Sequence, residues 1–160
     1  MAVDMFMKLG DIKGEAQDSV HAEEIDVLSW SWGMSNAGSA HMGSGQAAGR
    51  ANVQDLHFTK HIDVATPALM LACCNGKHFP EAKLIVRKAG EKPLEYLEIT
   101  MTDVLVSSYS SGGHGSEDRL TEQVSLNFGK VKVKYTEQKK DGKKGAQPEL
   151  GWDISANEKL

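Results

Sequence analysis

The chain has 160 residues, of which 40% are apolar and 25% are charged, and its formal net charge at pH 7 is −4. These values are typical of one globular domain, whose folding would bury roughly 70% of the surface of the unfolded chain. The negative charge argues against a nucleic-acid-binding protein, because binding to phosphates depends on clustered lysine and arginine. We expect a single domain over residues 1–160.

The sequence predicts neither a leader nor a membrane segment. Its N-terminal residues lack a basic stretch followed by an apolar run, so we expect no secretory signal peptide and synthesis in the cytoplasm. No window reaches the ~18 uninterrupted apolar residues of a spanning helix, so we expect no membrane insertion. The two cysteines, Cys73 and Cys74, are adjacent and cannot build a disulfide framework.

Alternation of apolar and polar residues with a period of two predicts most of the structure as strands. Residues 5–10 form the first predicted strand and residues 24–34 the second. In the second strand, Ile25 and Val27 share one face, and the other face carries Leu28, Trp30, Trp32 and Met34. This change of phase predicts a bulge at Val27 and Leu28 that would bend the strand around a barrel.

A second change of phase occurs near the C-terminus. Val124, Leu126 and Phe128 alternate with polar residues, and after Gly129 the apolar positions become Val131, Val133 and Tyr135. Glycine at such a point favours a bulge or a barrel corner. Strands are also predicted over residues 53–62, 82–88, 94–108 and 150–154, with 89–93 as a hairpin connection.

One short helix is predicted, with Thr66 as its N-cap, Pro67 at its first position and Gly76 as its C-terminal stop. The predicted fold class is therefore mainly β. We expect a small β-barrel formed by two sheets, with about seven strands and one short α-helix.

A glycine-rich arm occupies residues 33–50, which hold five glycines among serines and alanines. Loops of this length are usually functional or mobile. Glycine permits the backbone conformations that close docking requires, so the arm either reaches a neighbouring subunit or is a solvated loop. Residues 137–147 are rich in lysine and are predicted to form a solvated hairpin end.

We expect no catalytic residues and no cofactor. The sequence has no Gly-x-Ser-x-Gly motif, and Cys73 and Cys74 lie at the C-terminal end of the predicted helix, where the helix dipole disfavours a thiolate. The glycines at 112–115 are followed by Glu117 and Asp118 rather than by a phosphate-binding lysine, which predicts a hairpin turn.

Metal and nucleic-acid sites are not expected either. Asp55, His57 and His61 share a strand face, but the two histidines lie roughly 13 Å apart and cannot share an ion. Lys130, Lys132 and Lys134 alternate along a strand without interleaved aromatic residues, a pattern that also protects exposed strands from aggregation. Small polar residues such as Ser29 and Ser31, opposite Trp30 and Trp32, suit a surface that meets water or a loosely held protein.

Several segments form a distinctive set: HAEEIDVLSWSWG at residues 21–33, FTKHID at 58–63, EDRLTE at 117–122 and GW at 151–152. With these segments the chain resembles, nearly end to end, the Hcp (haemolysin-coregulated protein) family of type VI secretion tube subunits. The resemblance implies hexameric rings that stack into a tube inside a contractile sheath, with a spike protein at the tip. It also implies that the tube carries small effector proteins in its lumen and is secreted by this system.

The resemblance suggests two groups of functional residues. Ser29 and Ser31 are expected to face the lumen and contact cargo. The arm is expected to contact the adjacent protomer or ring through Gly38, His41, Met42, Gly43, Gly45 and Gly49. Two alternatives are a monomeric β-barrel that binds a small ligand and an enzyme with an appended catalytic domain, for which the residues after the last predicted strand leave no room.

Overall fold

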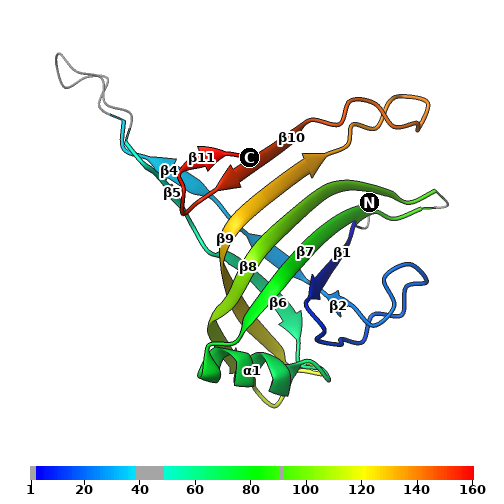
Figure 1. The fold of residues 1–160 in the computed structure, drawn as a ribbon. Helices are drawn as coiled ribbons and strands as arrows, with labels where there is room; N and C mark the ends of the chain where they lie inside the picture. The colour runs from blue at the N-terminus through cyan, green and yellow to red at the C-terminus, as the bar shows by residue number, and fades with distance from the viewer. Residues whose placement is uncertain (1–2, 39–48, 91) are drawn as a thin grey trace.

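The computed structural model describes residues 3–38, 49–90 and 92–160, which form a nine-stranded sheet, a two-stranded sheet and one helix (Figure 1). The elements are β1 (Val3–Leu9), β2 (Ile25–Asp26), β3 (Ser29–Ser31), β4 (Met34–Asn36), β5 (Ala51–Val53), β6 (Leu56–His61), α1 (Thr66–Asn75), β7 (His78–Lys88), β8 (Leu94–Gly112), β9 (Thr121–Tyr135), β10 (Glu149–Asp153) and β11 (Glu158–Lys159). The predicted mainly β class with one short helix is confirmed.

The large sheet curves into a barrel that does not fully close. Its antiparallel pairs run β3–β6–β9–β8–β7–β1–β2, and β10 and β11 extend it along the other half of β9. The open seam lies between β2 and β3, which follow one another in the chain. At this seam Val27 N donates to Met5 O (3.0 Å), and Leu28 N donates to Thr59 O (2.8 Å). Successive residues thus bond to opposite edges of the sheet, so the chain itself bridges the seam.

The predicted strand at residues 24–34 is therefore three strands. Its change of phase at Val27 and Leu28 is real, but it marks the transfer of the chain from β1 to β6 and not a bulge within one strand. Trp30 and Trp32, which share a face of the predicted strand, pack against the core. Leu28 and Met34 do not, because they are 43% and 50% exposed. Met34 belongs to β4, which pairs with β5 in the separate two-stranded sheet.

The change of phase at Gly129 is confirmed within one continuous strand, β9. Phe128 and Val131 are both buried on either side of it. The partner strand changes at the same place, from β6 along Thr121–Leu126 to β10 along Lys130–Lys134. Opposite Gly129, Asp103 of β8 has a positive φ of 57°. The bend therefore involves both strands, and it keeps apolar residues inside while the polar side of β9 stays on one face.

The helix α1 lies at the lower end of the barrel in Figure 1 and packs Leu69 and Ala72 against the core. The predicted N-cap is wrong by one residue: Ala65 occupies that position and makes no side-chain cap. Thr66 instead accepts a hydrogen bond from Asp63 N (3.0 Å) and donates one to Glu122 (2.9 Å). Gly76 ends the helix in a left-handed conformation, with φ 66°, as predicted.

Candidate functional site

A ladder of small polar side chains crosses four adjacent strands of the curved sheet. Ser29 of β3 is paired with Thr59 of β6, Thr59 with Gln123 of β9, and Gln123 with Ser110 of β8. Two residues further along each strand, Ser31 is paired with His57, His57 with Ser125, and Ser125 with Ser108. We call these eight residues the polar face. The two serines predicted to contact cargo, Ser29 and Ser31, are exposed at its edge strand.

Hydrogen bonds order the polar face from within. His57 Nδ1 lies 2.5 Å from Ser125 Oγ, and Ser110 Oγ donates to Gln123 Oε1 (3.1 Å). Beside the ladder, Asp55 accepts hydrogen bonds from Ser107 (2.7 Å) and Asn127 (2.8 Å). The face therefore presents positioned hydroxyl, amide and imidazole groups, with the one carboxylate of Asp55 already hydrogen-bonded at its margin.

The other side of the same strands faces the core. Trp30 is paired with Phe58, Phe58 with Val124, and Val124 with Tyr109. Phe58 and Val124 are 2% and 0% exposed. Because side chains alternate across a strand, the apolar packing fixes which residues form the polar face. The predicted alternation of serine and tryptophan in β3 is confirmed as a two-sided strand.

A lysine stripe continues the polar side of β9 beyond Gly129 and consists of Lys130, Lys132 and Lys134. Its neighbours on the adjacent strands include acidic and hydroxyl side chains. Lys134 is paired with Glu98 of β8 and Glu149 of β10. Lys130 is paired with Asp153, and its Nζ lies 3.9 Å from Oδ2 of that residue. Opposite charges on both flanks make this a mixed surface rather than the clustered basic surface that phosphate backbones attract.

The glycine-rich arm is anchored by the β4–β5 sheet, so part of the predicted loop is strand. At its ends, Gly38 is exposed, and Asn36 Nδ2 donates to Gly49 O (2.7 Å). A Cβ on Gly49 would lie 3.0 Å from Ala37 O, which is tighter than ordinary packing. The other predicted arm residues, His41, Met42, Gly43 and Gly45, lie outside the described residues.

Other kinds of site find no support in the part of the chain that the structure describes. There, no group of three or more His, Cys, Asp or Glu side chains is placed to hold a metal ion. Cys73 is half-buried and Cys74 exposed, and both are free thiols. No helix among the described residues is long and apolar enough to cross a membrane.

Comparison with known proteins places the chain. Residues 6–135 match the family model described as "Type VI secretion system effector, Hcp". The chain is 63% identical over 159 residues to protein hcp1 of Pseudomonas aeruginosa, with 98% of each sequence covered. The chain belongs to the Hcp family. As an Hcp protein it is a tube and effector protein of a type VI secretion system, secreted through that system, and hexameric ring assembly is consistent with this family.

Solved structures agree with the fold. A type six secretion system protein, 31% identical, has a TM-score of 0.93 and covers 99% of this chain and 100% of its own. Hcp1 from Salmonella typhimurium, 40% identical, has a TM-score of 0.83 with full coverage of both chains. Hcp is a family of structural, secreted proteins, and its members assemble with themselves as a type VI secretion tube.

A buried charge network in this Hcp protein was not predicted from the sequence. Lys60 and Glu122 are both 0% exposed, and their Nζ and Oε1 atoms lie 2.5 Å apart. Lys60 also donates to Asp63 Oδ1 (2.7 Å), whereas Thr66 and Tyr109 both donate to Glu122. The network joins β6, β8, β9 and α1. Desolvation and the hydrogen bond to Glu122 raise the pKa of Tyr109.

A second polar cluster fastens the loop between β1 and β2 to the sheet. The His21 ring stacks on Phe6 with centroids 4.5 Å apart, and its nitrogens are hydrogen-bonded to Glu24 and Glu95. Beside it, Arg87 donates to both oxygens of Asp18 (2.6 and 3.1 Å). The Arg87 guanidinium also lies 5.1 Å from the Phe6 centroid, so His21 and Arg87 both contact the same aromatic ring.

The contact between Asp18 and Arg87 predicts a loss of stability in acid. Hydrogen bonds from Arg87 and from the backbone N–H groups of Val20 and His21 hold the pKa of Asp18 well below its usual range. A depressed folded-state pKa stabilises the fold above the unfolded-state pKa of about 3.9, and this stabilisation is lost as pH falls through the folded-state pKa. Asp18→Asn should therefore lower the urea midpoint at pH 7, and its difference from the wild type should shrink below pH ~4.

Asp11→Asn is the matched control, because the Asp11 side chain is 86% exposed and lies 3.9 Å from Lys77. We expect its urea midpoint to follow the wild type at every pH, since exposed ion pairs contribute little. A constant difference between Asp18→Asn and the wild type from pH 7 to pH 2 would contradict the assignment to this carboxylate.

Proposed function

We propose that this Hcp protein forms hexameric rings whose polar face lines the central channel and contacts small effector proteins there. The single observation that supports this is the polar face itself, two adjacent rows of polar side chains that cross four strands of a strongly curved sheet. In this proposal Ser29 and Ser31 contact cargo directly. Stacked rings form a tube inside a contractile sheath, with a spike protein at its tip.

The chemistry of the polar face suits a carrier that must release its cargo. A neutral hydrogen bond contributes only about 0.5–1.5 kcal/mol net, because it replaces a bond to water. Several such bonds hold a protein reversibly, whereas a broad apolar surface would bind it through desolvation. The proposal therefore includes binding and release without any catalytic step. It also includes synthesis in the cytoplasm before secretion through the type VI system.

The arm would join adjacent protomers or rings in this assembly. Gly38 and Gly49 stand at its base on the β4–β5 sheet, and Figure 1 draws that sheet projecting away from the barrel. We include His41, Met42, Gly43 and Gly45 in the same contact on the strength of their place in the sequence. Native mass spectrometry and negative-stain microscopy test the assembly. A monomer at every protein concentration would overturn it, and ring-shaped particles would overturn the alternative of a monomeric ligand-binding module.

Ser31→Trp tests the contact with cargo. We expect the variant to form rings but to retain much less of a small effector protein co-expressed from the same secretion system, because the indole ring displaces the hydroxyl and fills the space above β3. Ser19→Trp is the control, since Ser19 is also exposed but lies in the loop between β1 and β2. Rings that vanish in Ser31→Trp, or cargo retained equally by both variants, would place Ser31 elsewhere than in the lumen.

A further inference from the structure

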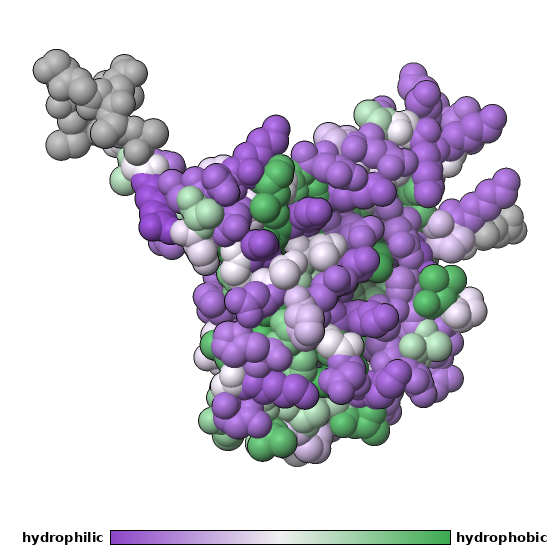
Figure 2. All heavy atoms as spheres, in the orientation of Figure 1, coloured by the Kyte–Doolittle hydropathy of each residue, from purple (hydrophilic) through white to green (hydrophobic). Residues whose placement is uncertain are grey.

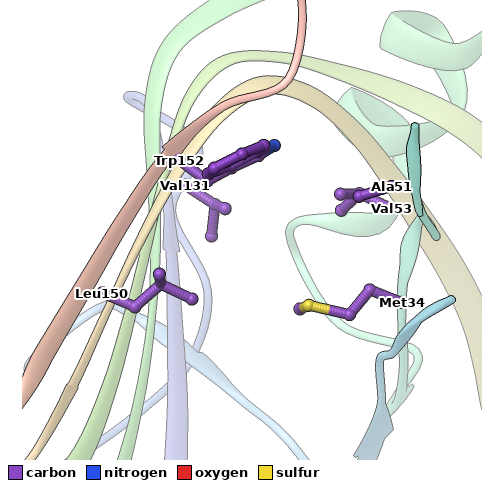
Figure 3. A pocket seen from close by; sticks show the side chains of 6 residues that line it. All are labelled: Met34, Ala51, Val53, Val131, Leu150 and Trp152. Atoms are coloured by element: carbon purple, nitrogen blue, oxygen red, sulfur yellow. The ribbon is translucent and has the colours of Figure 1, made fainter. Parts of the chain in front are cut away.

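An apolar recess lies between the β4–β5 sheet and the outer part of the large sheet (Figure 3). Its volume is about 200 Å³, and its lining contains no polar surface. Three side chains come from β9 and β10, three from β4 and β5, and they point toward one another across the gap: Val131, Leu150, Trp152, Met34, Ala51 and Val53.

The recess leaves apolar side chains in contact with water. Met34 is 50% exposed and Leu150 is 41% exposed, although Val131 beneath them is only 1% exposed. Figure 2 shows hydrophobic surface at this place, between the base of the arm and the β10 end, surrounded by hydrophilic atoms. Covering such side chains contributes roughly 25 cal/mol per Å² of apolar surface removed from water, so the recess favours an apolar occupant.

The recess is also held in shape without an occupant. Arg50, next to β5, donates from Nη2 to the backbone carbonyls of Ile154 (3.0 Å) and Ser155 (3.1 Å). These bonds tie the β4–β5 sheet to the end of β10. Trp152, which lines the recess, is itself packed against the hydrophobic core. A surface that is already ordered loses less conformational entropy when a partner binds.

A small-molecule ligand does not fit these observations. Ligand pockets usually have volumes of about 300–1,000 Å³ and a few polar groups that fix the orientation of the ligand. The recess is smaller and offers no such group. Its size suits one or two apolar side chains of a protein.

We propose that the apolar recess is half of the contact between two copies of this chain and receives an apolar side chain of the adjacent copy. The inference rests on the proposed ring assembly. Contacts that close a ring are head-to-tail, so each joins one surface to a different surface on the next copy. The recess is continuous with the proposed arm contact, because its Met34, Ala51 and Val53 belong to the same two strands that carry the arm.

Met34→Lys tests the recess. We expect this variant to keep the far-UV circular dichroism of the wild type and to need a roughly tenfold or higher concentration to form rings, because assembly would bury an ammonium group without a partner. Met70→Lys is the matched control, since Met70 is 46% exposed on α1, away from the recess, and it should form rings like the wild type. Native mass spectrometry across a dilution series measures both.

A second measurement tests whether position 34 is covered on assembly, in case Met34→Lys does not fold. Met34→Cys, in a background with Cys73→Ser and Cys74→Ser, is labelled with an environment-sensitive fluorophore, and we expect a blue shift when rings form. Rings without a blue shift, or rings of Met34→Lys at wild-type concentrations, would overturn the recess as an interface and leave the ring proposal standing. A wild-type protein that stays monomeric would overturn the proposed function and this inference with it.

Discussion

Lys60→Met is expected to lower the free energy of unfolding by about 3–5 kcal/mol, because it leaves buried carboxylates without their cation. Lys60 Nζ lies 2.5 Å from Glu122 and 2.7 Å from Asp63, and the side chains of these acids are 0% and 7% exposed. Methionine fills a similar volume, so the loss comes from the charge rather than from a cavity. Urea unfolding at pH 7 and constant subunit concentration measures the change.

Two further variants separate the charge effect from other causes. Lys13→Met removes the lysine of an exposed pair, since Lys13 and Glu23 have side chains 71% and 68% exposed, and should change stability by less than about 0.5 kcal/mol. Adding Glu122→Gln to Lys60→Met should restore part of the loss. The amide removes one buried negative charge, and its single oxygen can still accept the hydrogen bond that Thr66 or Tyr109 donates to one carboxylate oxygen of Glu122. A wild-type urea midpoint for Lys60→Met would show that the network needs no cation.

The ion pair of Lys60 and Glu122 could have been inferred in part from the sequence. Lys60 shares the strand phase of Leu56 and Phe58, and Glu122 shares that of Val124 and Leu126. A charged residue on the apolar phase of each of two strands indicates a buried ion pair. That the two strands are neighbours, with Lys60 paired with Glu122, follows only from the fold.

Strand alternation predicted the curved β fold because a strand that is buried on one side shows alternating apolar and polar residues in its sequence. The change of phase at Gly129 was located correctly for this reason. A change of partner strand produces no pattern of its own in the sequence. Alternation therefore predicts one strand over residues 24–34, although these residues pair with β1, β6 and β5 in turn. The alternation accordingly places Met34 on the same strand face as Trp30 and Trp32, whereas Met34 belongs to β4 and lines the apolar recess.

Part of the polar face could be predicted from the sequence. The serines of β3 were recognised as the polar side of a strand that carries Trp30 and Trp32. The rest of the polar face comes from β6, β8 and β9, and β6 is far from β8 and β9 in the sequence. Its hydrogen bonds, such as that between His57 and Ser125, depend on their register. The N-cap of α1 was misplaced because Thr66 bonds to Glu122 on β9, a tertiary contact that local rules do not include.

Phe58→Ala is expected to cost about 3–5 kcal/mol of stability, the usual loss for truncating a buried phenylalanine. Phe58 is 2% exposed and lies between Trp30 and Val124 on adjacent strands, next to the seam of the barrel. The residues on either side of it in β6, His57 and Thr59, point the other way and belong to the polar face. The substitution should therefore weaken the fold while it leaves the side chains of the polar face unchanged.

This separation makes Phe58→Ala informative about function as well as stability. Assembly stabilises the folded subunit by mass action, so the urea midpoint must be compared at one subunit concentration. Val20→Ala, at a 71% exposed position, is the control and should stay within about 0.5 kcal/mol of the wild type. Rings that form from folded Phe58→Ala should retain cargo normally, in contrast to Ser31→Trp. A loss of less than ~1 kcal/mol with impaired cargo retention would mean that the two sides of β6 are assigned the wrong way round.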